Sequence, residues 1–314
     1  MTLEGKVALV AGATRGAGRG IAEALGEAGA TVYCTGRSTR GAPATEGRSE
    51  TIEETAELVT ARGGRGFHVR CDHSVPEQVR ELFERVRSEQ GRLDILVNDI
   101  WGGDALTEFG KTFWQVSLDK GLTMLERGIH THLITSHFAV PLMIEGDDGL
   151  IIEITDGDSY GYRGNLFYDL VKTSVIRTAF TMARELRKTK IVSIALTPGF
   201  LRSEAMLDNF GVTEANWRDA AEKDPNFLES ETPFFVGRAV AALAQDAHVR
   251  KKNGRVFSSW ALADEYGFTD IDGRTPHWGR HFEKTYGVRL KTCDDAFYEH
   301  WKKGPMEVVF PDWP

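Results

Sequence analysis

The stretch KVALVAGATRGAG, residues 6–18, joins a short apolar run to a turn that contains three glycines. The apolar run is typical of a buried parallel strand. Gly12, Gly16 and Gly18 follow it in the spacing GxxxGxG, and a helix is predicted to start near Gly18. Glycines allow close approach of the backbone to a phosphate, and a helix N-terminus directs amide hydrogens at it. The stretch therefore predicts the first strand, turn and helix of a dinucleotide-binding fold.

Beyond this stretch, strand and helix patterns alternate. Further strands are predicted in TVYCTG, FHVRCD, LDILVND, GLIIEIT, KIVSIALTPG and GRVFSS. Two pairs, Thr51 with Glu54 and Ser74 with Glu77, have the spacing of capping boxes at helix starts. Alternation of this kind predicts an α/β fold, a doubly wound parallel sheet of the Rossmann type with helices on both faces.

The pattern predicts one domain over residues 1–263, followed by a C-terminal extension over 264–314. Residues 38–49 are interpreted as a polar loop, and 203–233, rich in acidic and aromatic residues, as an irregular substrate loop. The extension has no clear periodicity but is rich in aromatic residues: Trp278, Phe282, Trp301, Phe310 and Trp313. Such a composition predicts that the extension packs on its own domain or on a neighbouring subunit.

The composition is that of a soluble globular protein, with 41% hydrophobic and 27% charged residues and a net charge of −8. The acidic balance does not favour a nucleic-acid partner. No apolar run is long enough to span a membrane, and no secretion signal is recognised, so the expected location is the cytoplasm. Three widely spaced cysteines (Cys34, Cys71 and Cys293) predict reduced thiols and no metal site.

The end of the second strand indicates which nucleotide is bound. An acidic residue there would bind the ribose 2′-hydroxyl of NAD. This chain instead has neutral Gly36 followed by Arg37 and Ser38, and Arg15 lies in the glycine-rich turn together with Thr14. Two guanidinium groups without an acid favour a 2′-phosphate, so we expect NADP(H) in preference to NAD(H).

A second motif follows the fifth strand, in ITDGDSYGYRGNLFYDLVK, residues 154–172. Tyr168 and Lys172 are four residues apart at the start of a predicted helix, at the sheet edge where open α/β sheets bind ligands. The spacing alone is weak, since it recurs at Tyr298 and Lys302, which we interpret as ordinary tail sequence.

Taken together, the motifs resemble those of the short-chain dehydrogenase/reductase family over roughly residues 5 to 260. They are AGATRGAG at 11–18, Asp72 after the third strand, LVND at 96–99, YDLVK at 168–172 and PGFLRS at 198–203. The chain looks most like a subgroup of about this length with VYxTGR after the second strand and a C-terminal extension. The resemblance implies an NADP(H)-dependent oxidoreductase that interconverts a carbonyl and a secondary alcohol.

The resemblance also implies roles for individual residues. Tyr168 would be the general acid/base, and Lys172 would lower the pKa of Tyr168 by its charge and bind the nicotinamide ribose. The glycine-rich turn and the polar residues named above would bind the cofactor. They would be joined by Asp72, His73, Asn98, Pro198, Gly199, Leu201 and Ser203.

Asp156 departs from the family pattern, which has a serine about a dozen residues before the tyrosine. An ionised carboxylate accepts hydrogen bonds and repels a developing oxyanion, whereas a hydroxyl donates to it. Three alternatives remain open: Thr155 supplies the hydroxyl, a protonated Asp156 donates, or the site no longer runs ordinary carbonyl reduction. A second departure is Gly128, which stands near the position of the family's asparagine. Either a nearby histidine (His130 or His132) substitutes, or both are ordinary helix residues.

The leading hypothesis is a reductase for a hydrophobic ketone, with Trp101, Tyr160, Tyr162 and Phe167 lining its site. One alternative is a nucleotide-binding protein without hydride chemistry, and another is a lyase or isomerase that uses Asp156. The resemblance further implies a homodimer or homotetramer.

Overall fold

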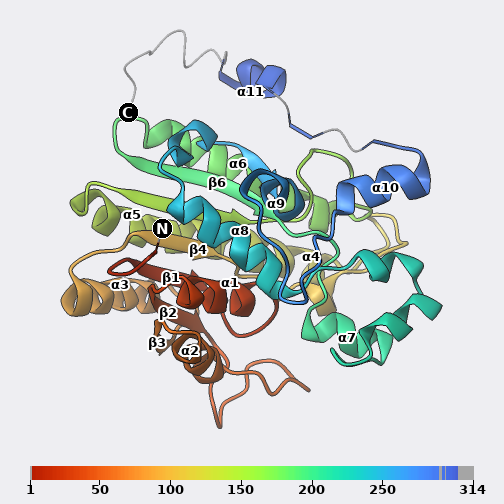
Figure 1. Ribbon diagram of the computed structural model, residues 1–314, viewed down its shortest axis with the longest axis horizontal. Coiled ribbons are helices and arrows are strands. Elements are labelled where there is room, and N and C mark those ends of the chain that lie inside the picture. The colour runs from red at the N-terminus through yellow and green to blue at the C-terminus, as the bar shows by residue number, and fades with distance from the viewer. Residues whose placement is uncertain (1, 290–291, 294, 303–314) are drawn as a thin grey trace.

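The computed structural model describes residues 2–289, 292–293 and 295–302, and its centre is a seven-stranded sheet (Figure 1). The strand order is β3-β2-β1-β4-β5-β6-β7, and every neighbouring pair is parallel. The strands are β1 (Val7–Ala11), β2 (Thr31–Gly36), β3 (Arg65–Arg70), β4 (Ile95–Asn98), β5 (Gly149–Ile154), β6 (Ile191–Thr197) and β7 (Val256–Ser258). Six of them lie within predicted runs, and β3 is shifted two residues toward the N-terminus of the predicted FHVRCD, residues 67–72. The doubly wound α/β sheet is confirmed.

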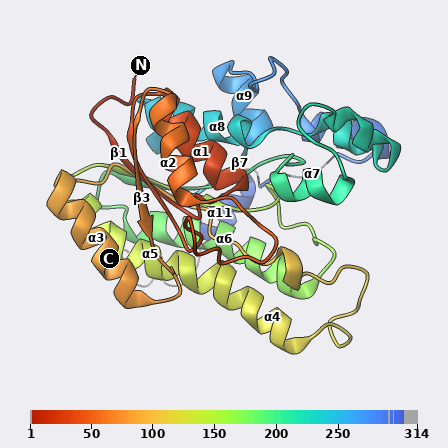
Figure 2. The same cartoon turned by 90° about the horizontal axis from the view of Figure 1, so that it is seen from below.

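Helices cover both faces of the sheet (Figure 2). One face carries α1 (Gly16–Glu27), α2 (Ile52–Ala61), α8 (Pro233–Gln245) and α9 (Ser259–Tyr266); the other carries α3 (Pro76–Gln90), α4 (Leu118–Leu125), α5 (Thr131–Glu145) and α6 (Leu166–Glu185). Alternate strand residues face opposite ways. Val10 and Ile152 are buried toward α1 and α8, whereas Leu9 and Ile151 are buried toward α3 and α5.

The two predicted capping boxes have different outcomes. Thr51 caps α2, and its side chain accepts a hydrogen bond from the amide of Glu54, as predicted. The box at Ser74 is wrong, because α3 begins at Pro76 and its N-cap residue is Val75. The helix starts one residue later because Pro76 suits its first position, and Ser74 lies in the preceding turn, where its backbone and hydroxyl both donate to the Asp72 carboxylate.

Parallel strands bring four loops to one edge of the sheet. β1 pairs with both β2 and β4, so the chain reverses its winding direction at β1. The loops after β1, β4, β5 and β6 therefore open on the same side, where doubly wound sheets bind ligands. They begin at Gly12, Asp99, Thr155 and Pro198.

The segment 203–233 is more regular than expected. It contains α7 (Glu204–Phe210) and the 3₁₀ turns η3 (Trp217–Glu222) and η4 (Pro225–Glu229). Short helical turns of this length lack the repeated apolar spacing that reveals longer helices in a sequence. Further short turns are η1 (Asp104–Leu106) and η5 (Val249–Lys252), and a π-helical turn, η2 (Glu126–His130), joins α4 to α5.

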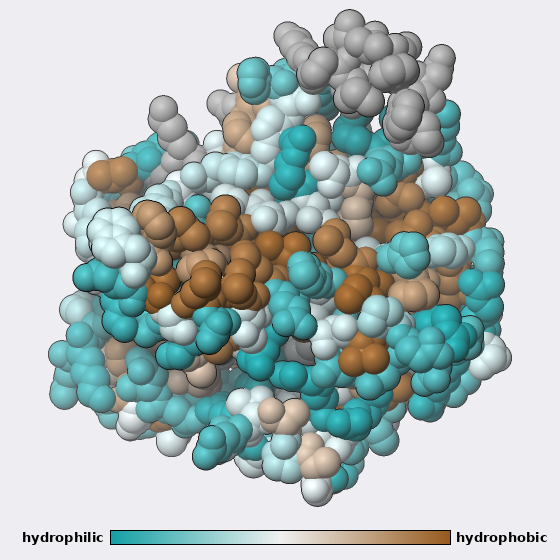
Figure 3. All heavy atoms as spheres, turned by 180° about the vertical axis from the view of Figure 1, so that it is seen from behind, coloured by the Kyte–Doolittle hydropathy of each residue, from teal (hydrophilic) through white to brown (hydrophobic). Residues whose placement is uncertain are grey.

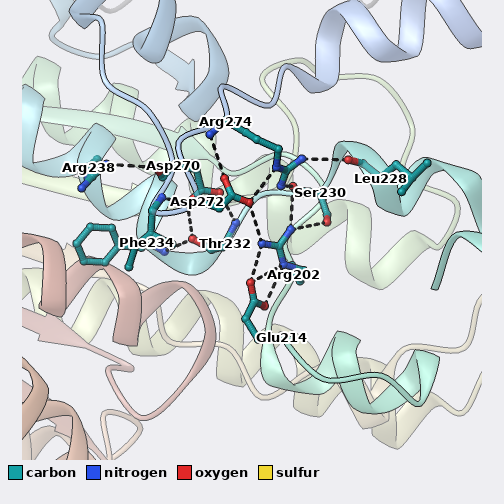
Figure 4. A network of polar contacts seen from close by, with 11 residues as sticks. Arg202, Glu214, Leu228, Ser230, Thr232, Phe234, Arg238, Asp270, Asp272 and Arg274 are labelled. Atoms are coloured by element: carbon teal, nitrogen blue, oxygen red, sulfur yellow. Dashed lines mark hydrogen bonds and ion pairs between the residues drawn. The ribbon is translucent and has the colours of Figure 1, made fainter. Parts of the chain in front are cut away.

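Arg202 anchors the start of this segment to the C-terminal extension (Figure 4). Its buried guanidinium donates to the Glu214 carboxylate at 2.7 Å and lies 3.5 Å from that of Asp272. Its flat face lies 4.0 Å from the centre of the Trp217 ring. Arg274 adds a hydrogen bond to the carbonyl of Ser230 at 2.9 Å. These polar and ring contacts hold the segment 202–230 against residues 272–274 of the C-terminal extension.

The extension continues into two helices, α10 (Trp278–Tyr286) and α11 (Asp295–Lys302). In α11, Trp301 contacts the Phe180 ring on α6, with ring centres 4.7 Å apart. The Tyr298 hydroxyl accepts a hydrogen bond from the backbone amide of Val256 at 2.8 Å, so it covers the edge of β7. The second Tyr–Lys match therefore has a structural role. Phe310 and Trp313 lie outside the described residues.

A band of hydrophobic side chains crosses the face opposite α1 and α8 (Figure 3). That face carries α4, α5 and α6, whose exposed apolar residues include Leu118, Leu122, Leu133, Ile144 and Leu170. None of the helices in the described part of the chain is both long enough and apolar enough to cross a bilayer.

Candidate active site

A cleft of about 1620 Å³ runs along the carboxyl edge of the sheet. The glycine-rich turn lies in it, and so do Tyr168 and Lys172 from α6. It is also lined by most of the predicted cofactor residues: Gly12, Thr14, Arg15, Gly16, Arg37, Ser38, Asp72, His73, Pro198, Gly199, Leu201 and Ser203. Residues that are far apart in the sequence thus meet in one cavity.

Two glycines of the turn are required by close backbone contacts. A Cβ atom on Gly12 would lie 2.4 Å from the carbonyl oxygen of Asp99, and one on Gly18 would lie 2.4 Å from that of Gly12. The backbone of Gly12 also has φ +92°, which side chains other than hydrogen rarely allow. The turn therefore packs directly against the loop after β4. Gly18 supports the turn from within α1 and does not line the cleft.

The N-terminus of α1 holds an anionic group from the chain itself. The backbone amide of Gly16 donates to the carboxylate of Glu204, at the start of α7, at 2.8 Å. A second contact places the Arg19 guanidinium 3.9 Å from the same carboxylate. Free amides and the helix dipole make this end of α1 favourable for negative charge. Glu204 therefore occupies a position that fits a phosphate.

Three arginines face the part of the cleft beyond β2. Arg15 donates to Glu50 at 3.3 Å, Arg48 is paired with Glu50 and Asp208, and Arg37 lies 3.9 Å from Asp72. One terminal nitrogen of Arg15, Nη2, is buried without a hydrogen-bond partner in the described structure. Arg48, in the polar loop, was not among the predicted residues.

Two predicted cofactor residues have their side chains engaged within the protein. His73 is buried between the hydroxyls of Thr35 and Thr135, each 2.8 Å from a ring nitrogen, and burial lowers its pKa to about 3. Asn98 does not line the cleft, because its amide donates to Ser136 at 2.9 Å and to Glu153 at 2.7 Å. Both side chains stabilise the sheet edge and its helices.

Asp72 lines the cleft, and its carboxylate accepts hydrogen bonds from the backbone and side chain of Ser74. Burial opposes its ionisation, but these hydrogen bonds and the nearby Arg37 charge hold the pKa of Asp72 below its ordinary value. It is therefore an anionic acceptor at neutral pH.

Asn165 starts the helix that carries the Tyr–Lys pair. Its side chain accepts a hydrogen bond from the amide of Tyr168 at 3.1 Å and so caps α6. Lys172 follows one turn later, and its ammonium nitrogen lies 4.0 Å above the Trp101 ring and 5.6 Å from that of Tyr168. Burial lowers the pKa of Lys172, an effect opposed by the charges of Asp156, Asp99 and Asp104.

The hydroxyl of Tyr168 donates to the Asp156 carboxylate at 2.9 Å. Burial, and then the charge and hydrogen bond of Asp156, raise the pKa of Tyr168 above its ordinary value. This direction is opposite to the lowering expected from Lys172. The correction has a simple physical cause: the negative group bonds the hydroxyl directly, whereas the lysine ammonium lies against Trp101.

Comparison with known proteins identifies the family. The profile of the short chain dehydrogenase family matches residues 6–211. The chain belongs to the short-chain dehydrogenase/reductase family. It is 36% identical over 277 residues to dehydrogenase/reductase SDR family member 1 of Mus musculus. The matched region covers 87% of this chain and 85% of the relative. The expected subgroup resemblance is thereby confirmed.

Other relatives of this dehydrogenase/reductase are more distant. It is 29% identical to the 7alpha-hydroxysteroid dehydrogenase of Clostridium sardiniense, over 66% of this chain and 75% of that protein. Among solved structures, a putative dehydrogenase from Xanthomonas campestris superposes with a TM-score of 0.72 at 22% identity, covering 88% of this chain and 94% of that one. The structural likeness supports the fold alone.

The structure bears on the three alternatives for the serine position of this short-chain dehydrogenase/reductase. The Thr155 hydroxyl donates to the backbone carbonyl of Lys172 at 2.7 Å, so its hydrogen is already used within the protein. Asp156 accepts from the Tyr168 hydroxyl at 2.9 Å. In this structure the Tyr168 hydroxyl therefore has a carboxylate, Asp156, beside it in place of a hydroxyl donor.

The position of the family's asparagine is filled by aromatic packing. A Cβ atom on Gly128, in the π-helical turn, would lie 2.5 Å from Val171 and 3.2 Å from the Trp101 ring. Trp101 thus takes the space beside Lys172. His132 is buried, with ring nitrogens 2.6 Å from the Glu153 carboxylate and 3.0 Å from the carbonyl of Ile100, and His130 is exposed. Neither contacts Lys172, which supports their interpretation as ordinary helix residues.

The substrate end of the cleft includes residues that the sequence interpretation did not assign to it. Trp278, Phe282 and Tyr286 of α10 line the cleft, as do Phe200 and Trp260. The spacing of four between the three α10 aromatics is a helical signal that could have been found. Of the aromatics expected at the site, Trp101 and Tyr162 line the cleft; Phe167 packs against Gly121, and Tyr160 stacks on Phe297.

Proposed function

We propose that this dehydrogenase/reductase transfers a hydride between NADP(H) and a carbonyl or secondary alcohol of a hydrophobic substrate, with Tyr168 as general acid/base. The observation that carries the proposal is the shared cleft, in which Tyr168 and Lys172 line the same cavity as the glycine-rich turn. Without such a cavity the Tyr–Lys spacing would be a weak motif.

Three features of the cleft support binding of a nicotinamide dinucleotide. Gly12 allows close backbone approach, the amide of Gly16 holds a carboxylate where a phosphate would fit, and Arg15 has a buried unpartnered nitrogen. The preference for NADP(H) is favoured by Arg15, Arg37 and Ser38, with Arg48 in addition, beside a strand end without an acid. The cofactor would supply or accept the hydride.

Proton transfer falls to the chain's own residues. In reduction, the Tyr168 hydroxyl would leave Asp156 and donate its proton to the substrate oxygen. The Lys172 ammonium, held on the same side of α6, would stabilise the resulting phenolate and hydrogen-bond the ribose. Asn98 would support the sheet edge and would not contact the cofactor, since its amide is already bonded to Ser136 and Glu153.

A hydrophobic substrate is favoured by aromatic side chains along the cleft: Trp101, Tyr162, Phe200, Trp260, Trp278, Phe282 and Tyr286. Relatives named for a hydroxysteroid and for an acyl-carrier-bound ketone, a FabG from Escherichia coli among them, point the same way.

Asp156 favours a second candidate, an elimination or isomerisation on the same fold. A carboxylate next to Tyr168 could remove a proton from a substrate carbon, as a general base does. Nucleotide binding without hydride chemistry is the third candidate, but a pure binding protein would have no use for a tyrosine hydroxyl within the cleft.

The test is NADPH oxidation with a panel of ketones and diketones. We expect Tyr168→Phe to lower kcat/KM at least a hundredfold, because it removes the proton donor. Tyr162→Phe, a second cleft tyrosine, is the matched control and is expected to change kcat/KM less than threefold. If no ketone is reduced in a Tyr168-dependent way, the reductase proposal fails, and release of a leaving group without NADPH oxidation would favour the lyase.

The apolar band on α4, α5 and α6 suggests association of copies of this chain as a homodimer or homotetramer. Sedimentation equilibrium tests this proposal. Leu122→Glu with Leu133→Glu, two exposed positions in the band, should shift the mass toward a monomer. A cytoplasmic location remains a prediction.

A further inference from the structure

We propose that the substrate carries a cationic nitrogen on the carbon next to the one that exchanges the hydride, and that Asp156 selects it. The substrate class is thus an amino alcohol and the matching amino ketone, with an aryl or other apolar group on the far side. The inference rests on the proposed function and adds the charge of the substrate to it.

The first step concerns the partners of Asp156. Its carboxylate accepts one hydrogen bond in the described structure, from the Tyr168 hydroxyl. Tyr168 has a single hydroxyl hydrogen, so it cannot donate to Asp156 and to a substrate oxygen at the same time. When Tyr168 turns to the substrate, Asp156 loses its donor. Asp156 is half-buried, and a partly desolvated carboxylate without a donor is costly, so a productive substrate brings one.

The nearest arginine cannot take over this role. Arg163 donates to the backbone carbonyls of Asp156, Gly161 and Ser159, at 2.5, 3.1 and 2.5 Å. Its guanidinium therefore holds the loop after β5 and makes no hydrogen bond to the Asp156 carboxylate within the described residues. The loop is fixed, and the Asp156 charge remains open to the cleft.

Lys172, the one lysine that lines the cleft in the described part of the chain, lies among several acids. Lys172 is held 4.0 Å above the Trp101 ring and interacts with the charges of Asp99, Asp104 and Asp156. All three acids line the cleft. Arg127 and Arg163 line the cleft as well, but they donate to the carbonyl of Gly102 and to carbonyls of the loop after β5. Asp104 accepts from the Trp101 indole at 2.6 Å, and burial raises the pKa of Asp99 to about 7. Asp156 is therefore the acid of the three with which a substrate cation would pair.

The walls of the cleft that contains Asp156 suit an organic cation. Trp101 stands edge-on to Tyr168, with ring centres 5.6 Å apart, and Tyr162 and Phe282 line the same cleft. Aromatic faces attract cations and also pack against apolar groups. A carboxylate bonded to Tyr168, in a cleft with aromatic residues on its walls, therefore fits an ammonium group joined to an aryl or alkyl body.

The chemical step gives the same answer. In reduction, the hydride adds to the carbonyl carbon, the C=O electron pair moves to oxygen, and Tyr168 supplies the proton; oxidation runs in reverse. Negative charge on that oxygen is repelled by the Asp156 carboxylate when the substrate is neutral. A substrate ammonium on the adjacent carbon attracts both the oxygen and Asp156. The covalent bonds of the ammonium group do not change in the reaction. NADP(H) supplies the only redox equivalents needed.

The kinetic test compares three alcohols of matched size as substrates with NADP⁺. They are 2-amino-1-phenylethanol, 1-phenylethane-1,2-diol and 1-phenylpropan-1-ol, assayed near neutral pH, where the alkylammonium keeps its proton. The expected result is a kcat/KM at least tenfold higher for the amino alcohol, mainly through KM. Asp156→Asn should abolish the preference, and Asp119→Asn, an exposed acid of α4 outside the cleft, should retain it. A preference that survives in Asp156→Asn, or none in the wild type, overturns the inference.

A binding measurement separates this inference from the proposed function. Calorimetry would compare 2-phenylethylammonium with 2-phenylethanol on the wild-type protein and on Asp156→Asn, with no turnover required. We expect the ammonium to bind at least tenfold more tightly to the wild type only. Equal binding of the two ligands overturns the inference even if ketones are reduced, whereas selective ammonium binding without Tyr168-dependent turnover would refute the proposed function alone.

Discussion

The carboxylate of Glu204 accepts a hydrogen bond from the backbone amide of Gly16 at 2.8 Å, across 188 residues of sequence. The contact ties the start of α7 to the start of α1, at the end of the helix where a cofactor phosphate would bind under the proposed function. Asp208, one turn further along α7, is paired with Arg48 of the polar loop. Two acids of α7 thus hold this helix against the nucleotide side of the cleft.

Glu204→Gln should therefore strengthen cofactor binding. The carboxylate competes with a phosphate for the Gly16 amide, and the helix N-terminus favours negative charge by up to about 1 kcal/mol. We expect the dissociation constant of NADPH, measured by fluorescence titration, to fall about two- to fivefold. Glu222→Gln, an exposed acid in the same segment, should leave it unchanged. Weaker binding by Glu204→Gln would mean that Glu204 positions the cofactor.

Arg15→Ala and Arg37→Ala should each weaken NADPH binding and spare NADH. A guanidinium hydrogen bond to a phosphate contributes about 1.5–3 kcal/mol, so the KM for NADPH should rise about tenfold to a hundredfold. NADH lacks the 2′-phosphate, and its KM should change less than twofold. Arg40→Ala is the control, since exposed Arg40 is paired with Glu57 outside the cleft. Equal losses for both cofactors would contradict the NADP(H) preference.

The strands were predictable because their apolar runs are short, buried and bounded by turn residues. Leu9, Val97 and Ile152 all lie in such runs, and all are fully buried. The glycine-rich turn was predictable for a related reason, since the tight contact of Gly12 with Asp99 excludes any side chain there. Local patterns therefore predicted the sheet, the parallel direction of its strands and the position of the cleft.

Contacts between distant residues were not predictable from those patterns. The hydrogen bond between Glu204 and Gly16 depends on how α7 packs over the edge of the sheet. The contact of Arg202 with Asp272 depends on where the C-terminal extension packs against the domain. The pKa of Tyr168 was expected to fall because spacing places Lys172 on the same side of the helix. The pKa of Tyr168 is raised instead, because its hydroxyl is buried and donates to Asp156, and spacing reveals neither the burial nor the nearer partner.

Gly128→Asn, which restores the family's residue type, should destabilise this protein. The new side chain would meet Val171 and the Trp101 ring, where even a Cβ atom lies 2.5 and 3.2 Å from existing atoms. Overpacking of this kind costs about 1–3 kcal/mol. Urea denaturation should show the loss, and the double variant with Trp101→Ala should recover part of it. Full stability of Gly128→Asn would show that Trp101 moves freely out of this space.

Arg202→Met should loosen the segment 203–233 without unfolding the sheet. The buried guanidinium holds Glu214 and Asp272 together (Figure 4). It also lies against the Trp217 ring. Losing a buried partner costs about 3–5 kcal/mol, but Glu214 is half exposed and becomes hydrated, so we expect about 2–3 kcal/mol. Hydrogen exchange should quicken in 203–233 and 270–274. Arg218→Met, which removes an exposed guanidinium from the same Trp217 ring, should have no such effect.

Glu231 should give the protein a stability that declines as the pH rises. Its carboxyl accepts from the Ser259 hydroxyl at 2.6 Å and from the Gly199 amide at 2.8 Å, and its other oxygen, Oε1, is buried without a partner in the described structure. Burial raises the pKa of Glu231 from 4.5 to about 8. Between these values the folded state holds a proton that the unfolded state has released. Folding is therefore favoured at the acidic end and loses stability toward about pH 8.

Glu231→Gln removes this titration and keeps one oxygen for Ser259 and Gly199. Urea denaturation of both proteins from about pH 5 to about pH 8 should show the wild type losing up to about 1.4 kcal/mol per pH unit relative to the variant. Glu222→Gln, at an exposed site, should run parallel to the wild type. Parallel curves for Glu231→Gln as well would mean that Glu231 is ionised in the folded protein. Its burial beside Gly199, which lines the cleft, would then require a cation or water at Oε1.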